Sequence, residues 1–369
     1  MPFLERGGRL RGILDLATCR YPSFLFGGSI GALLPVFHLH DESRESLEAQ
    51  FAHLAEHGYR TVTSDAIARF VREGRHPGSR TVALCFDDAW ATVWTVALPL
   101  LRRYGFQAIT FAIPGRIEEA DRCRPTIDDR AEGAPPVTSE SPLVTWPELE
   151  ALHGSGFVDV QSHAYSHASV FCQSEPLGFV TPDFATRDLL ARPQVSTDDP
   201  LVFLTPADLG APLFPQRSRL SDAVRYLDDP EVRRRLMAFV RDRGGAVFFD
   251  RPSWQAELRA QLGEPRGLPE SPEARRRAIR DDLDRARSVL NARLRTNTIR
   301  HLCFPWGVAG TTARAIARAV GYETAFSDRL FGFRAVRFGD DPYCLMRLNG
   351  KYITKLPRVP RRSVTAGRS

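Results

Sequence analysis

Two adjacent carboxylates and a pair of imidazoles are the side chains of this chain with the clearest chemical potential. Asp87 and Asp88 follow the apolar run 82–86, and His163 and His167 lie four residues apart further along the chain. Catalytic zinc sites commonly have three protein ligands, often two histidines and one carboxylate, and keep a coordination position for water. The four side chains could supply those ligands and leave one carboxylate as a base. A metal-dependent hydrolase is therefore the first hypothesis.

Both groups follow segments that we predict to be strands. The aspartates end an apolar run, and the histidines come directly after Phe157–Ser162. In α/β folds, ligands and catalytic groups gather at the carboxyl ends of strands. If the segment 163–167 enters a helix, the two imidazoles share one face of it. An aspartate pair can also simply cap a helix, so the hypothesis rests on the combination of the two groups.

Strand-like runs alternate with helical patterns along most of the chain. This alternation predicts an α/β fold with parallel strands and covering helices, but it does not separate a barrel from an open sheet. We predict strands near residues 33–37, 60–62, 81–86, 107–113, 157–162, 299–304 and 323–327.

Three segments resemble the motifs of the polysaccharide deacetylases, the NodB-homology or carbohydrate esterase family 4 proteins. Thr81–Ala89 resembles their Thr-Phe-Asp-Asp-Gly motif, Ser162–His167 their Ser/Thr-His-x-x-x-His motif, and Cys303–Gly307 the third motif, which ends in proline and an aromatic residue. The order and rough spacing agree. The flanking segments Leu34–His38, Leu47–Val62, Thr145–Gly156 and Asp281–Leu294 are also similar to the family.

The resemblance implies a distorted (β/α)7-type NodB barrel with a metal site at the carboxyl ends of its strands. We expect this barrel to comprise residues 33–168 and 275–348. An N-terminal extension (1–32) and a C-terminal tail (349–369) would flank it.

Residues 169–274, between the second and third motifs, are far more than one connection needs. We expect them to form an inserted lid or substrate-shaping subdomain, with a decorative or oligomerising insertion as the alternative. Within this segment we predict a helix from Ser221 to about Arg243 and a possible strand at Ala246–Phe249.

The resemblance also assigns roles to individual residues. Asp88, His163 and His167 would bind the metal, and Asp87 would be the general base. A backbone N–H next to the aromatic residue of the third motif would stabilise the oxyanion, which indicates Trp306, after Pro305. The metal would lower the pKa of its bound water and polarise the acyl carbonyl.

Two features of the family pattern are missing. The third motif often has an arginine that orients the catalytic aspartate, and Cys303 stands at that position. The family's last motif usually carries a histidine that protonates the leaving amine, but no histidine follows His301. His38, His40 and His301 are the available substitutes, and we choose His38 as the candidate acid.

Composition agrees with a globular enzyme. The chain has 369 residues, 43% of them hydrophobic, and a formal net charge of +6. It has no apolar run long enough for a membrane span, no evident secretory signal and no Cys-x-x-Cys spacing among its six cysteines, so we expect a cytoplasmic protein with reduced thiols. The arginine runs 233–235 and 275–277 have helical periodicity and nearby acids, which favours solvated helix faces over nucleic-acid binding.

The sequence therefore predicts a metal-dependent hydrolase that removes an N-acyl group, most simply acetyl, from an amino sugar or glycan-like substrate. Zinc is the expected metal, although Co²⁺, Ni²⁺ or Mn²⁺ would also fit the ligand set. Three alternatives remain open: a deacylase of a small N-acyl or N-formyl metabolite, a catalytically degenerate binding or scaffolding protein, and an iron oxygenase.

Overall fold

The structure is a computed structural model of the chain. It describes residues 21–129, 141–186, 189–264, 266–327 and 334–359. The chain divides into two compact units. The histidine unit contains residues 113–116 and the described residues of 162–327, and the aspartate unit contains the other described residues, including 117–129 and 141–161.

Seven strands of the main sheet follow one another in the order β13-β12-β5-β4-β3-β1-β14, and β2 pairs with β3. The pairs β1–β14, β1–β3, β2–β3, β3–β4, β5–β12 and β12–β13 are all parallel, which confirms the α/β class. The order has β13 and β14 at its two ends, so the described pairings form an open series and not a closed ring. The strands are β1 (Val36–Leu39), β2 (Arg60–Thr61), β3 (Thr81–Asp88), β4 (Ala108–Ala112), β5 (Val158–Ser162), β12 (His301–Cys303), β13 (Thr324–Phe326) and β14 (Leu348–Asn349).

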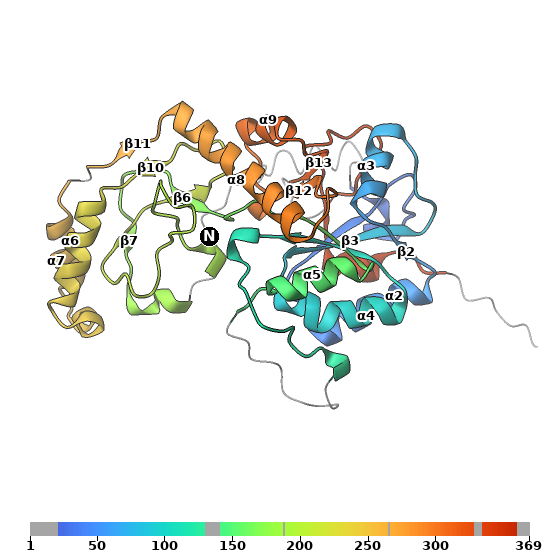
Figure 1. Ribbon diagram of the computed structural model, residues 1–369, viewed down its shortest axis with the longest axis horizontal. Helices are drawn as coiled ribbons and strands as arrows, with labels where there is room; N and C mark the ends of the chain where they lie inside the picture. Colours follow the sequence, from blue (N-terminus) through green and yellow to red (C-terminus); the bar gives the residue numbers. More distant parts are fainter. Residues whose placement is uncertain (1–20, 130–140, 187–188, 265, 328–333, 360–369) are drawn as a thin grey trace, which may run out of the picture. The chain divides into compact units, whose positions relative to one another are not determined.

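Strand β3 is central to the aspartate unit. All eight of its residues are buried, as expected for a strand with neighbours on both edges and helices over the sheet. Helices α2 and α4 pack against each other in this unit, and Figure 1 shows α5 beside them. The helices of this unit are α2 (Arg44–Glu56), α3 (Ser64–Glu73), α4 (Leu98–Tyr104) and α5 (Trp146–Gly154).

The histidine unit contains β12, β13 and the predicted insertion. The predicted insertion contains short antiparallel pairs (β6–β9, β7–β8 and β10–β11), and two helices between β10 and β11, α6 and α7, pack together (Figure 1). Their bounds are β6 (Ser169–Phe171), β7 (Gly178–Phe179), β8 (Pro212–Leu213), β9 (Gln216–Ser218), β10 (Tyr226–Leu227), β11 (Leu268–Pro269), α6 (Pro230–Arg241) and α7 (Trp254–Leu262). The long helix α8 (Pro272–Arg293) and α9 (Thr311–Ala319) pack against each other.

Two local predictions in the insertion are wrong. The helix expected from Ser221 begins at Pro230, because the Asp229 side chain accepts a hydrogen bond from the Glu231 N–H and proline favours the first helical position. The strand expected at Ala246–Phe249 is a 3-10 helix, Gly245–Asp250. A short apolar run does not distinguish a strand from a helical turn, and here Phe248 alone in this turn is fully buried, in a cluster with α6 and α7.

The predicted domain boundaries stay predictions, as does the cytoplasmic location. Residues 1–20 of the expected N-terminal extension and residues 360–369 of the expected tail lie outside the described residues. The beginning of that tail is a 3-10 helix, Gly350–Lys355. Within the described part of the chain, no helix is both long and apolar enough to cross a membrane.

Candidate functional site

The two aspartates lie at the carboxyl end of β3, as the sequence predicts. Asp87 is 4% exposed and Asp88 6% exposed. Asp88 has a φ of 68° and Ala89 a φ of 56°, in the left-handed region that side chains with a Cβ atom rarely adopt. Such backbone strain is found most often at functional sites, where the surrounding structure maintains it. The strand therefore ends in a turn with left-handed backbone angles, which an ordinary helix cap does not need.

An arginine from the C-terminal part of the chain holds Asp87. The Arg347 guanidinium donates one hydrogen bond to each carboxylate oxygen of Asp87, at 2.6 and 2.7 Å. Arg347 is 3% exposed, so the ion pair is nearly shielded from water. Such paired hydrogen bonds fix the orientation of a carboxylate plane.

Arg347 corrects one conclusion from the sequence. The orienting arginine was missing at Cys303, but a guanidinium reaches the predicted base from just before β14, which pairs with β1 through Leu348 and Phe37. The signal available in the sequence was a single arginine inside the otherwise apolar run Leu345–Leu348, where an unpaired charge would be costly to bury.

Two candidate acids lie near the predicted base in the aspartate unit. His38 is in β1 and His40 follows it. One potential ligand atom from each of His38, His40 and Asp87 lies within 4.8 Å of the other two. The His40 Nε2 atom is 3.8 Å from Asp87 Oδ2, and its side chain is 52% exposed. Both histidines thus lie near Asp87.

Asp88 has a neighbour that orients it. The Trp90 indole N–H donates a hydrogen bond to Asp88 Oδ2 at 3.0 Å. Residues that hydrogen-bond to a ligating carboxylate restrict its direction and influence metal affinity. A carboxylate held in this way is suited to binding a cation.

The two histidines come from a turn after β5. No helix forms over residues 163–167, contrary to one possibility considered from the sequence; instead Ala164 and His167 have φ values of 64° and 50°. The turn still brings the imidazoles together, with ring centroids 4.9 Å apart. The His163 Nδ1 atom lies 2.7 Å from the Cys303 carbonyl oxygen. A carbonyl can only accept, so Nδ1 carries the proton and Nε2 keeps the lone pair that a metal needs.

A buried tyrosine supports the start of this turn. The Tyr322 hydroxyl oxygen lies 2.8 Å from Ser162 Oγ and 3.0 Å from the Leu283 carbonyl oxygen. Burial raises the pKa of the Tyr322 hydroxyl well above its usual value, so this group stays neutral. Ser162 Oγ in turn accepts a hydrogen bond from the Ala164 N–H.

The third motif lies beside the histidines in the same unit. Pro305–Gly307 form a short 3-10 turn in which Trp306 has a φ of 55°. The Trp306 and His167 ring centroids are 4.2 Å apart. His301 lies at the other end of β12, fully buried, with its Nδ1 atom 2.7 Å from Thr324 Oγ1. This position favours a structural role for His301.

The described residues thus include a candidate Asp–His metal set made of Asp88, His163 and His167. Its chemistry fits a divalent metal, because it combines one carboxylate with two imidazoles, and the His163 tautomer leaves Nε2 available.

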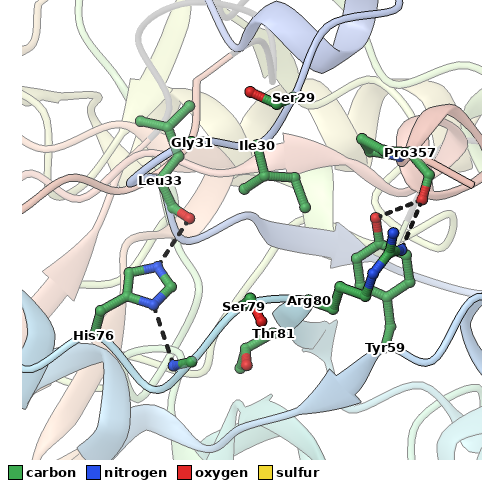
Figure 2. A pocket seen from close by; sticks show the side chains of 11 residues that line it. Ser29, Ile30, Gly31, Leu33, Tyr59, His76, Ser79, Arg80, Thr81 and Pro357 are labelled. Atoms are coloured by element: carbon green, nitrogen blue, oxygen red, sulfur yellow. Dashed lines mark hydrogen bonds between the residues drawn. The ribbon is translucent and has the colours of Figure 1, made fainter. Parts of the chain in front are cut away.

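A pocket in the aspartate unit is separate from these residues. It has a volume of about 220 Å³, and Thr81, at the first position of β3, contributes to its lining. Asp87 and Asp88 end the same strand, roughly 20 Å away along a chain rising 3.3 Å per residue. Figure 2 shows the His76 ring beside the Leu33 carbonyl on one side of this pocket, 3.1 Å from Nε2 to the oxygen. The Gly78 N–H donates to His76 Nδ1 at 3.1 Å. No predicted site residue lines it.

The sequence matches known deacetylases over part of its length. The family model described as polysaccharide deacetylase matches residues 74–193, which include both aspartates and both histidines. The poly-β-1,6-N-acetyl-D-glucosamine N-deacetylase of Escherichia coli K12 is 24% identical over 143 residues, which are 38% of this chain and 20% of the relative. The putative polysaccharide deacetylase YxkH of Bacillus subtilis is 28% identical over 90 residues, 22% of this chain and 32% of the relative. The matches therefore span a third or less of these relatives.

Two solved structures share the fold over most of the chain. The deacetylase domain of BpsB from Bordetella bronchiseptica gives a TM-score of 0.53 at 17% identity, covering 87% of this chain and 97% of that one. The de-N-acetylase of Aggregatibacter actinomycetemcomitans gives a TM-score of 0.50 at 15% identity, covering 85% of this chain and 93% of that one. At these low sequence identities, the structural similarity supports a shared fold and nothing more specific.

Proposed function

Because this chain belongs to the polysaccharide deacetylase family, we propose that it is a metal-dependent hydrolase that removes an N-acyl group, most simply acetyl, from an amino sugar or glycan-like substrate. The observation that carries the proposal is the end of β3. There, two buried carboxylates stand side by side, one paired with a guanidinium and the other belonging to the Asp–His metal set.

Asp87 acts as the general base in this proposal. The neighbouring Arg347 charge favours the ionised carboxylate, which is the form that accepts a proton. The bidentate contact also restrains the carboxylate, so that it can meet the attacking water in one orientation. Asp87 therefore removes the proton from the water that attacks the acyl carbon.

Asp88, His163 and His167 are the proposed metal ligands. A divalent metal held by them would supply an acidified water and a polarised acyl carbonyl. Two imidazoles with one carboxylate favour zinc, although Co²⁺, Ni²⁺ and Mn²⁺ also accept such ligands. The Cys303 carbonyl supports this role by selecting the ligating tautomer of His163.

Two further roles complete the proposed reaction. The left-handed backbone at Trp306 makes its N–H, after Pro305, the candidate donor to the oxyanion that forms from the acyl oxygen. The leaving amine needs a proton, and His38 is the proposed acid, with the exposed His40 beside Asp87 as the second candidate.

The substrate class is inferred from the relatives. The E. coli relative is named as an N-deacetylase of poly-β-1,6-N-acetyl-D-glucosamine, which supports an N-acetylated glycan. Since the match covers only part of both proteins, the acceptor and its length are part of the proposal.

Measurement of acetate and free amine release tests the function directly. N-acetylglucosamine oligomers and small N-acetyl and N-formyl amides would be compared, with metal-loaded and with exhaustively chelated protein. We expect acetate and amine to be released from the glycan oligomers only by the metal-loaded protein. Release confined to the small amides would indicate that the substrate is a small metabolite and not a glycan. Full activity after metal removal would overturn the proposed mechanism.

Two variants separate the roles of base and ligand. Asp87→Asn should keep the bound metal but lower kcat by about 10²- to 10⁴-fold, the usual contribution of general acid–base catalysis. His163→Ala should lose both the metal and the activity. Metal content by elemental analysis would accompany the rates, and an active Asp87→Asn variant would contradict the assignment of the base.

A further inference from the structure

The turn that carries both histidines has no regular secondary structure, yet its backbone is closely held. The Gly115 N–H donates to the Tyr165 carbonyl at 3.0 Å, and Arg116 Nε donates to the Ser166 carbonyl at 3.2 Å. These contacts satisfy the carbonyls of Tyr165 and Ser166. The N–H groups of the same two residues need a different partner, because no helix or strand supplies one here.

Asp282 is that partner. Its carboxylate accepts hydrogen bonds from the Tyr165 N–H at 3.1 Å, the Ser166 N–H at 3.0 Å and the Ser166 hydroxyl at 2.5 Å. Asp282 is 8% exposed and lies 116 residues from Ser166 in the sequence. Burial raises the pKa of the Asp282 carboxyl, and the hydrogen bonds from the turn oppose this rise.

The helix that carries Asp282 is firmly placed. Ile279, Leu283, Ala286 and Leu290 of α8 are all fully buried. One turn after Asp282, the Arg285 guanidinium lies 4.2 Å from the centre of the Tyr165 ring. Helix α8 thus contacts both the backbone and a side chain of the turn.

We propose that Asp282 is a positioning residue for the metal centre, which holds the turn so that His163 and His167 keep the directions needed to bind one ion. The inference rests on the proposed function. Asp282 touches neither imidazole in the described contacts and acts through the Tyr165 and Ser166 amides. Removal of a residue that orients metal ligands without itself binding the metal typically lowers metal affinity by about 10- to 100-fold.

Asp282→Asn tests this role with little change in volume. The new NH₂ group must face at least one N–H of the turn, so at least one of the three hydrogen bonds is lost. We expect the Kd for Zn²⁺, measured by competition with a chelator, to rise about 10- to 100-fold. Excess zinc should restore kcat, with KM unchanged, because the carboxylate does not contact substrate in this proposal.

Two further variants control the experiment. Asp281→Asn changes the exposed neighbour on the same helix and should leave zinc affinity unchanged. Ser166→Ala removes only the hydroxyl contact and should weaken zinc binding by a smaller factor. If Asp282→Asn fails to fold, Ser166→Ala decides the question, since unchanged zinc affinity in this variant would then overturn the inference.

Hydrogen exchange supplies a readout that needs neither metal nor substrate. The Tyr165 and Ser166 amides should exchange faster in Asp282→Asn, while the β12 amides keep their wild-type rates. Wild-type zinc affinity in a folded Asp282→Asn protein would overturn the inference. If the wild-type protein binds zinc without hydrolysing any N-acyl substrate, only the proposed function fails. If it binds no zinc, unchanged amide exchange at the turn would overturn the positioning role.

Discussion

The strand end with Asp87 and the turn with the two histidines are supported in different ways. Asp87 is held by a buried ion pair with Arg347, whose side chain comes from 260 residues away. The histidine turn depends on several backbone hydrogen bonds, including those from Tyr165 and Ser166 to Asp282. Both places contain left-handed residues, so both need support from outside their own segment.

This difference has an energetic consequence. Removal of one partner from a buried ion pair leaves an uncompensated charge, which typically costs about 3–5 kcal/mol. Loss of one neutral contact among several costs less, because the remaining contacts still hold the backbone. The aspartate end should therefore be sensitive to a single substitution, and the histidine turn should lose its geometry gradually.

Arg347→Met gives the largest expected effect. It replaces the guanidinium by an apolar chain and leaves the Asp87 charge buried, so we expect the free energy of unfolding to fall by about 3–5 kcal/mol. Denaturant unfolding at neutral pH measures this change. Activity should fall as well, because Asp87 loses its orientation.

The double variant Arg347→Met with Asp87→Asn is the matched control. It removes both charges and should recover most of the lost stability without recovering activity, because the base is also gone. If the double variant is as unstable as Arg347→Met, packing around the arginine and not the unpaired charge explains the loss.

Gly115→Ala should have an intermediate effect on the histidine turn. A Cβ atom at residue 115 would lie 2.5 Å from the Tyr165 carbonyl oxygen, so the turn must shift. Overpacking of this kind typically costs about 1–3 kcal/mol, and we expect zinc affinity to fall with it. Thermal unfolding and zinc titration would measure the two effects.

Gly154→Ala is the control for this substitution, since its Cβ atom would meet no other atom within 4 Å. It should leave zinc affinity unchanged. Equal zinc affinity in Gly115→Ala and the wild type would show that the turn tolerates displacement.

Trp90→Phe should have the smallest effect of the three. It keeps a ring but removes the indole hydrogen bond to Asp88, and we expect zinc affinity to fall by about 10-fold. Trp94→Phe is matched, because the Trp94 indole donates to the Arg124 carbonyl and not to an aspartate, and the loss of this hydrogen bond should not change zinc binding. Equal zinc affinities in Trp90→Phe and Trp94→Phe would show that the Trp90 hydrogen bond does not influence metal binding.

Much of the site could be predicted from local sequence. The run ending in Asp87 and Asp88 predicts a buried strand because its residues are apolar without interruption, and β3 is buried throughout. The predicted β5 and β12 are also confirmed, with His163 directly after one and Pro305 shortly after the other.

Predictions were weakest where tertiary contacts override local preference. The spacing of His163 and His167 is compatible with a helix, but the backbone adopts left-handed angles at Ala164 and His167 instead. Local propensity cannot predict such angles for residues other than glycine, because they are unfavourable until long-range contacts compensate for them.

The chemical groups at the ends of the strands could be identified from local sequence, since hydrophobic runs specify where strands end and the motif residues follow them directly. The side chains that hold these groups in place became visible in the packed molecule. Arg347 reaches Asp87 from 260 residues away, and Asp282 reaches Ser166 from 116 residues away. Contacts at such separations leave no periodic pattern in the sequence, because they depend on how the strands and helices pack and not on the residues beside them.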